Sequence, residues 1–126
     1  MLFDTDVLIW ALRGHKRAAA AIDKADRLEL SVVSYMELIQ GVRDKKELRL
    51  ARAYLADLGF HILPLTEDIG HRASVYLEEY ALTSGIRIPD ALIAATAVEN
   101  QVRLCSGNAK HYRAIAELEL QVFRAG

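Results

Sequence analysis

The chain has 126 residues, 52% of them hydrophobic, and a formal net charge of -1 at pH 7. This length suits one domain that buries a core without structural zinc, and the single cysteine, Cys105, excludes a disulfide framework. The balanced charge excludes a global positive field for nucleic acid, so any such contact must be local. No apolar run reaches the ~18 to 20 residues of a membrane span, and Asp4 is unlike the basic start of a signal sequence, so a cytoplasmic protein is expected.

Short apolar runs alternate along the chain with stretches of helical periodicity, a pattern typical of β-α units around a mostly parallel sheet. In chain order the pattern predicts strands at residues 2–3, 28–33, 61–65, 103–105 and 120–123, the last at a sheet edge. Helices are predicted at residues 5–12, 16–24, 45–58, 66–82 and 90–100, with a further one opening at Ser34. The segment 83–89 contains Gly85 and Pro89 and is predicted to be a loop. The helix after it is almost wholly apolar and is therefore expected to be buried.

Acidic and polar residues follow several of these strands. Asp4 ends the first strand, Glu37 lies in the first turn of the helix after the second, and Asp90 opens the buried helix. Ser106 and Asn108 follow the fourth strand. Ligands of open α/β sheets bind beyond the carboxyl ends of the strands, where such residues converge. We therefore expect these side chains to meet in one pocket.

Each acid also has a purely structural interpretation. Ser34 and Glu37 form an S-x-x-E capping box, which accounts for Glu37 without any function. Asp90 could cap its own helix, and Asp4 or Asp6 could cap the first helix and complement its dipole. Capping does not require every cap to be acidic or to fall on one edge of the sheet. The combination therefore favours a functional pocket.

Crowded carboxylates raise one another's pKa unless a cation neutralises them. All-oxygen ligands select Mg²⁺ or Mn²⁺ over zinc, and the histidines have no zinc spacing, since His15, His61, His71 and His111 are isolated. Such an ion assists in-line cleavage of a phosphodiester, with Glu37 orienting the water or acting as general base if it does not bind the ion. Hydrolysis of nucleic acid is therefore the predicted reaction class.

Four segments, taken in order, resemble the PIN-domain ribonucleases and specifically the VapC-type toxins: LFDTDVLIWAL, SVVSYMELIQGV, GIRIPDALIAATA and LCSGNAKHYRAI. The resemblance runs nearly end to end. It implies one PIN domain over residues 1–126, folded as a three-layer α/β/α sandwich with a mostly parallel central sheet of about four to five strands. It also implies an endoribonuclease toxin that uses Mg²⁺ or Mn²⁺ and usually forms a homodimer. Such toxins are held inactive by a VapB-type antitoxin and have no membrane association.

The resemblance also implies roles for individual residues. Asp4, Glu37 and Asp90 occupy the acidic positions that bind the metal in this family. Asn108 occupies the fourth catalytic position, where many relatives carry Asp and others Asn.

Supporting roles fall on three further residues. Ser106 matches the small hydroxyl residue that supports the family's pocket. Asp6 stands where relatives often carry Asn or Ser, and it is expected to support the pocket or cap the first helix, with Ser34 as another supporting residue. Tyr112 is expected to pack in the core or at the dimer contact rather than stack on a base, because of its helical spacing.

Two rival interpretations remain open. Asp4-Thr5-Asp6 is a D-x-D motif, and with Ser34 it suggests a haloacid-dehalogenase-type phosphatase, but the lysine and late acidic pair of that chemistry are missing. The other rival is a catalytically inactive PIN-like module that binds RNA or protein. Failure of the pocket to hold a metal would favour this binding module.

Overall fold

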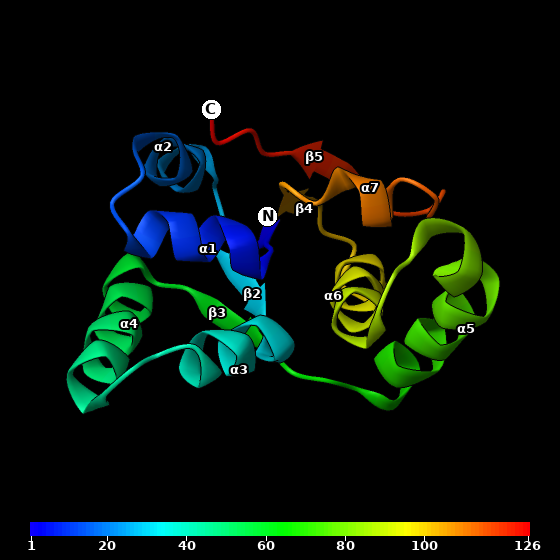
Figure 1. Ribbon diagram of the computed structural model, residues 1–126, viewed down its shortest axis with the longest axis horizontal. Coiled ribbons are helices and arrows are strands. Elements are labelled where there is room, and N and C mark those ends of the chain that lie inside the picture. Colours follow the sequence, from blue (N-terminus) through cyan, green and yellow to red (C-terminus); the bar gives the residue numbers. More distant parts are fainter.

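The computed structural model describes residues 1–126 and contains one five-stranded sheet of order β3-β2-β1-β4-β5 (Figure 1). The strands are β1 (Leu2–Phe3), β2 (Glu29–Ser31), β3 (His61–Leu63), β4 (Leu104–Ser106) and β5 (Leu120–Val122). All four neighbouring pairs are parallel, so the predicted mostly parallel sheet is in fact wholly parallel. The last strand lies at an edge, as predicted.

Seven helices cover the two faces of this sheet. They are α1 (Thr5–Leu12), α2 (Lys16–Lys24), α3 (Val32–Gln40), α4 (Lys45–Leu58), α5 (Glu67–Ser84), α6 (Ile88–Glu99) and α7 (Ala109–Tyr112). In Figure 1, α1, α2 and α4 lie on one side of the strands and α5, α6 and α7 on the other. None of these helices combines the length and apolar character needed to cross a membrane.

The strands divide the apolar residues between two cores, one on each face. Leu2 and Leu104 belong to the core under α5 and α6, whereas their neighbours Phe3 and Cys105 belong to the core under α1 and α2. This division arises because successive side chains of a strand point to opposite faces. The predicted three-layer α/β/α sandwich is therefore confirmed. Burial raises the pKa of the Cys105 thiol to about 11, which agrees with its expected role as a buried packing residue.

The start of α3 differs from the prediction. The helix begins at Val32, because the hydroxyl of Ser31 caps it by accepting a 3.0 Å hydrogen bond from the Val33 backbone N–H. The predicted capping box of Ser34 and Glu37 is therefore wrong, and Glu37 lies in the second turn of the helix. The two valines favour a strand by local propensity, but the cap at Ser31 prevails.

The start of α6 also differs. The helix begins at Ile88, and its N-cap residue, Arg87, makes no capping hydrogen bond with its side chain. Pro89 lies in the first turn, where backbone N–H groups have no hydrogen-bond partner within the helix, so proline is tolerated there. The loop predicted to run to residue 89 therefore ends at residue 87. Asp90 stands inside the first turn and is not the N-cap. The other predicted ends shift by one or two residues, and the four-residue α7 was not predicted.

Candidate active site

Asp4 lies between the ends of the neighbouring strands β1 and β4. Its Oδ1 accepts a 2.8 Å hydrogen bond from the Thr5 backbone N–H and so caps α1, while Oδ2 accepts from Ser106 Oγ at 2.7 Å. Burial raises the pKa of Asp4 to about 6; the negative charge of Asp6 adds to this rise, and the bond from Ser106 opposes it. The same carboxylate therefore serves both as a helix cap and as a buried acid in a polar cluster with Ser106, Asn108 and Asp90, which is called the pocket below.

Asp90 reaches the same place from the opposite layer. The hydroxyl of Tyr112 lies 3.0 Å from Asp4 Oδ2 and 3.4 Å from Asp90 Oδ1, so one hydroxyl contacts both acids. Asp90 Oδ2 lies 3.1 Å from His111 Nδ1, which is also 2.9 Å from Asn108 Nδ2. Burial, together with the charges of Asp4 and Asp90, raises the pKa of Tyr112 far above its usual value, so its hydroxyl remains a hydrogen-bond donor.

Asp6 anchors the loop that follows β4. Its Oδ2 accepts a 2.9 Å hydrogen bond from the Gly107 backbone N–H. A side chain at position 107 would place its Cβ 2.7 Å from that oxygen, so only glycine permits this approach without displacing Asp6. Burial raises the pKa of Asp6, and the charge of Asp90 adds to the rise. Asp6 therefore fixes the loop that carries Asn108.

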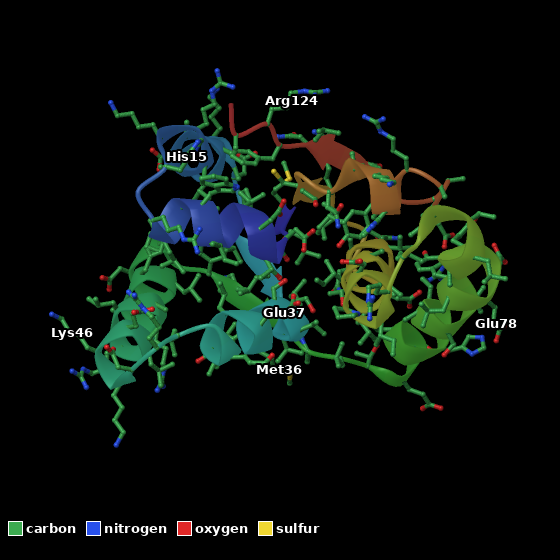
Figure 2. The ribbon with its side chains drawn as sticks, in the orientation of Figure 1. His15, Met36, Glu37, Lys46, Glu78 and Arg124 are labelled. Atoms are coloured by element: carbon green, nitrogen blue, oxygen red, sulfur yellow. The ribbon has the colours of Figure 1, made fainter.

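Glu37 is connected to the pocket through Thr5. Thr5 Oγ1 donates a 2.6 Å hydrogen bond to Glu37 Oε1 and lies 2.9 Å from Ser34 Oγ. Because Thr5 has one hydroxyl proton, Ser34 must supply the proton of the second contact. Figure 2 labels Glu37 near the centre of the molecule, whereas Lys46 and Glu78 lie at opposite margins.

The chain thus brings Asp4, Asp90, Ser106 and Asn108 into one connected network, with Glu37 attached through Thr5. No three acidic, histidine or cysteine side chains converge closely enough to enclose a metal by themselves. The groups that converge are nonetheless carboxylates, and burial raises the pKa of one of them, Asp4. Mg²⁺ is usually held by only one or two carboxylates, with water and phosphate completing its shell. The residues therefore fit a divalent ion of this kind.

Sequence reasoning missed three residues of this network. Thr5 could have been found from its place directly after Asp4 at the end of β1. His111 is isolated in the sequence, so its contacts with Asp90 and Asn108 were not predicted. Tyr112 is fully buried, as expected for a core residue, yet its hydroxyl reaches the pocket. The spacing of apolar residues can predict that a tyrosine is buried, but it does not predict which polar group the hydroxyl contacts.

Comparison with known proteins agrees with this geometry. The PIN domain family model matches residues 1–117. Ribonuclease VapC10 of Mycobacterium tuberculosis is 34% identical over 123 residues, which cover 94% of this chain and 90% of the relative. The chain therefore belongs to the PIN-domain family and, within it, to the VapC-type ribonucleases.

Solved structures share the fold. A toxin-antitoxin complex from Klebsiella pneumoniae superimposes with a TM-score of 0.76 at 28% identity and covers 93% of each chain. VapBC2 from Rickettsia felis, bound to a DNA fragment from its promoter, gives a TM-score of 0.82 over 98% of each chain. Its identity is only 20%, so that second match supports the fold alone.

Proposed function

We propose that this chain is a metal-dependent endoribonuclease and the toxin of a toxin-antitoxin pair. The observation that carries the proposal is the convergence of Asp4 and Asp90 on one hydroxyl, beyond the ends of β1 and β4. Asp4 caps α1, but Asp90 does not cap α6, so helix capping does not explain why the two acids meet. The ribonuclease relatives and the PIN domain match support the reaction class. We further propose that residues 1–126 form a single domain, since one sheet separates and organises both cores.

Mg²⁺ or Mn²⁺ is the proposed cofactor, with Asp4 and Asp90 as its direct ligands and Glu37 as a ligand through a bound water, since no three acids converge closely. A bound divalent ion supplies positive charge that makes water more acidic and stabilises the charge that builds on the scissile phosphate. Asp4 enters this role with its Oδ2 held by Ser106 and its Oδ1 held only by the Thr5 N–H. Its burial disfavours the unpaired negative charge and thereby favours a cation at this place.

Glu37 and Asn108 complete the proposed catalytic set. Oε1 of Glu37 is occupied by the Thr5 hydroxyl, whereas Oε2 makes no hydrogen bond within the protein. If Glu37 does not hold the ion, that free oxygen can take a proton from the attacking water or orient it. The amide nitrogen of Asn108 faces His111, which leaves its carbonyl oxygen for a ligand or for RNA. Asp6, Ser34 and Ser106 hold these groups in place.

The proposed partners are an RNA substrate, a VapB-type antitoxin and a second copy of the chain. The neighbouring structures are named as toxin-antitoxin or VapBC complexes, which supports the antitoxin. Met36 on α3 is 56% exposed and Ile88 on α6 is 64% exposed, and these two helices pack together. Exposed apolar side chains of this kind favour a protein contact such as a homodimer. With RNA as substrate, we expect the enzyme to act in the cytoplasm.

Cleavage of a mixed RNA pool tests the proposal. Wild type and Asp90→Asn are each incubated with Mg²⁺, Mn²⁺ or EDTA, and circular dichroism checks that the variant is folded. We expect cleavage only by wild type with a metal. Cleavage by Asp90→Asn, or by wild type in EDTA, would overturn the proposed site. Metal binding without cleavage of any RNA would favour the inactive binding module.

A further inference from the structure

Tyr112 is the only residue whose side chain contacts both Asp4 and Asp90. It ends α7, its side chain is fully buried, and its ring belongs to the core beneath α5 and α6. The hydroxyl lies at the edge of that core, 3.0 Å from Asp4 Oδ2 and 3.4 Å from Asp90 Oδ1. The acids come from different layers of the sandwich, so this hydroxyl bridges the two layers.

Both acids also have other partners. Ser106 Oγ donates to the same Asp4 oxygen at 2.7 Å, and His111 Nδ1 lies 3.1 Å from the other oxygen of Asp90. These contacts limit how each carboxylate can rotate, but neither of them links one acid to the other. Only the hydroxyl of Tyr112 contacts both acids directly. Because the ring is packed in the core, the position of the hydroxyl is set by the fold rather than by a mobile side chain.

We propose that Tyr112 is a positioning residue whose hydroxyl holds Asp4 and Asp90 at the separation from which both can contact one divalent cation. This role rests on the proposed function. Two anions that face each other repel and would turn apart without a donor between them. Because the Tyr112 hydroxyl has one proton, it is shared between Asp4 Oδ2 and, more weakly, Asp90 Oδ1 as a three-centre hydrogen bond. This shared proton keeps both carboxylates near the geometry of the bound state, so less reorganisation is needed when the cation enters. Partners that orient metal ligands in this way commonly affect affinity by about 10-fold to 100-fold.

The test compares Tyr112→Phe with a matched control, Tyr76→Phe. Tyr76 is also buried, and its hydroxyl also donates to a carboxylate, that of Glu117, in the same core but away from the pocket. Each variant loses one hydroxyl and keeps the ring. The affinity for Mn²⁺ is measured by calorimetry on the purified full chain without RNA, and melting temperatures are recorded with and without Mn²⁺.

We expect Tyr112→Phe to bind Mn²⁺ about tenfold more weakly, or worse, while Tyr76→Phe binds it as wild type does. In cleavage assays, the Mn²⁺ concentration for half-maximal activity rises in Tyr112→Phe, and excess Mn²⁺ restores much of kcat. A purely structural role would instead lower the melting temperature of both variants and leave Mn²⁺ affinity unchanged.

Three results would overturn the role of Tyr112. Unchanged Mn²⁺ affinity in Tyr112→Phe would leave the hydroxyl as a packing feature. Tighter Mn²⁺ binding would mean that the hydroxyl competes with the cation for the carboxylates. Absence of Mn²⁺ binding by wild type would overturn the proposed metal-dependent function itself, and with it this role. Failure of the role alone therefore differs from failure of the function, because in the first case wild type still binds Mn²⁺.

Discussion

The hydroxyl of Thr5 donates a 2.6 Å hydrogen bond to the carboxylate of Glu37, although the two residues lie in different helices. Thr5 directly follows Asp4, so the residue that caps α1 and the residue that fixes Glu37 are neighbours in the chain. This contact gives Glu37 a defined orientation toward the pocket, and Ser34 completes it from one turn earlier in α3. The contact therefore ties the carboxylate of the proposed general base to the residue that follows Asp4.

Removing the Thr5 hydroxyl tests whether this orientation matters. Thr5→Val keeps the size of the side chain but leaves Glu37 Oε1 without its donor, so we expect kcat at saturating RNA to fall about tenfold or more. Thr5→Ser keeps the donor and should retain most of the activity. The check is single-turnover cleavage with Mn²⁺ in excess, alongside circular dichroism. Equal rates for Thr5→Val and Thr5→Ser would show that the contact with Glu37 is not used in catalysis.

The positions of the acids could be predicted from sequence because strand order along the chain and the parallel-sheet rule place Asp4 and Asp90 at one edge. The starts of α3 and α6 could not be predicted, whereas those of α1, α2 and α4 were. Ser31 and Ser34 are both good caps, and only the end of β2 at Ser31 decides between them. Likewise, Pro89 breaks a helix by composition but fits a first turn, so the sequence alone allowed both starts of α6.

The contacts made by α7 were hidden for another reason. A helix of four residues is too short to show periodicity, so nothing in the sequence marked its existence. Tyr112 was expected to pack in the core or at a dimer contact, and its ring is buried in the core. Its hydroxyl meets Asp4 across 108 positions of sequence, and such a distant polar contact follows only from the packed fold.

Asp6 can be tested as a support rather than a metal ligand. Its two oxygens already accept hydrogen bonds from the backbone N–H groups of Val7 and Gly107, at 2.8 and 2.9 Å. We therefore expect Asp6→Asn to leave Mn²⁺ affinity within about threefold of wild type. Calorimetric titration with Mn²⁺ is the measurement. A loss as large as that caused by Asp90→Asn would instead make Asp6 a ligand.

Gly107→Ala should disturb the hydrogen bond between the Gly107 N–H and Asp6 Oδ2. The added Cβ would lie 2.7 Å from Asp6 Oδ2, so the carboxylate must move and its bond to the loop after β4 must lengthen. Because that loop carries Asn108, we expect cleavage to fall several-fold while the melting temperature changes little. Gly70→Ala is the control, since Gly70 lies in α5 and a Cβ there meets no atom within 4 Å. Full activity in Gly107→Ala would show that this loop tolerates the displacement.

Arg72 connects elements far from the pocket. Its guanidinium forms ion pairs with Glu99 of α6 and, at 2.7 Å, with Glu117 beyond α7. We expect Arg72→Met to lower the free energy of unfolding by about 1 to 2 kcal/mol, since the network is partly exposed and screened by solvent. Cleavage per folded molecule should not change. Urea denaturation measures the effect, and Arg43→Met, which breaks an exposed pair with Glu47, should change stability little.

The pKa of Asp4 predicts an unusual dependence of stability on pH. The unfolded chain has the ordinary value of 3.8, whereas burial raises the folded value to about 6. Between these two values the folded protein holds a proton that the unfolded chain has released. The metal-free protein should therefore lose stability as pH rises from about 4 to 6, with a contribution from Asp4 of at most about 3 kcal/mol.

Asp4→Asn isolates this contribution, because the amide mimics the protonated acid. The difference in unfolding free energy between the metal-free variant and wild type should favour the variant at pH 7 and shrink toward pH 4. With Mn²⁺ at pH 7, wild type should be more stable than Asp4→Asn, because the cation neutralises the Asp4 carboxylate but has no negative charge to bind at the amide. Urea denaturation at both pH values, with and without Mn²⁺, measures all of these differences. A variant less stable than wild type in EDTA at pH 7 would mean that the buried charge of Asp4 is stabilised by the protein alone and needs no cation.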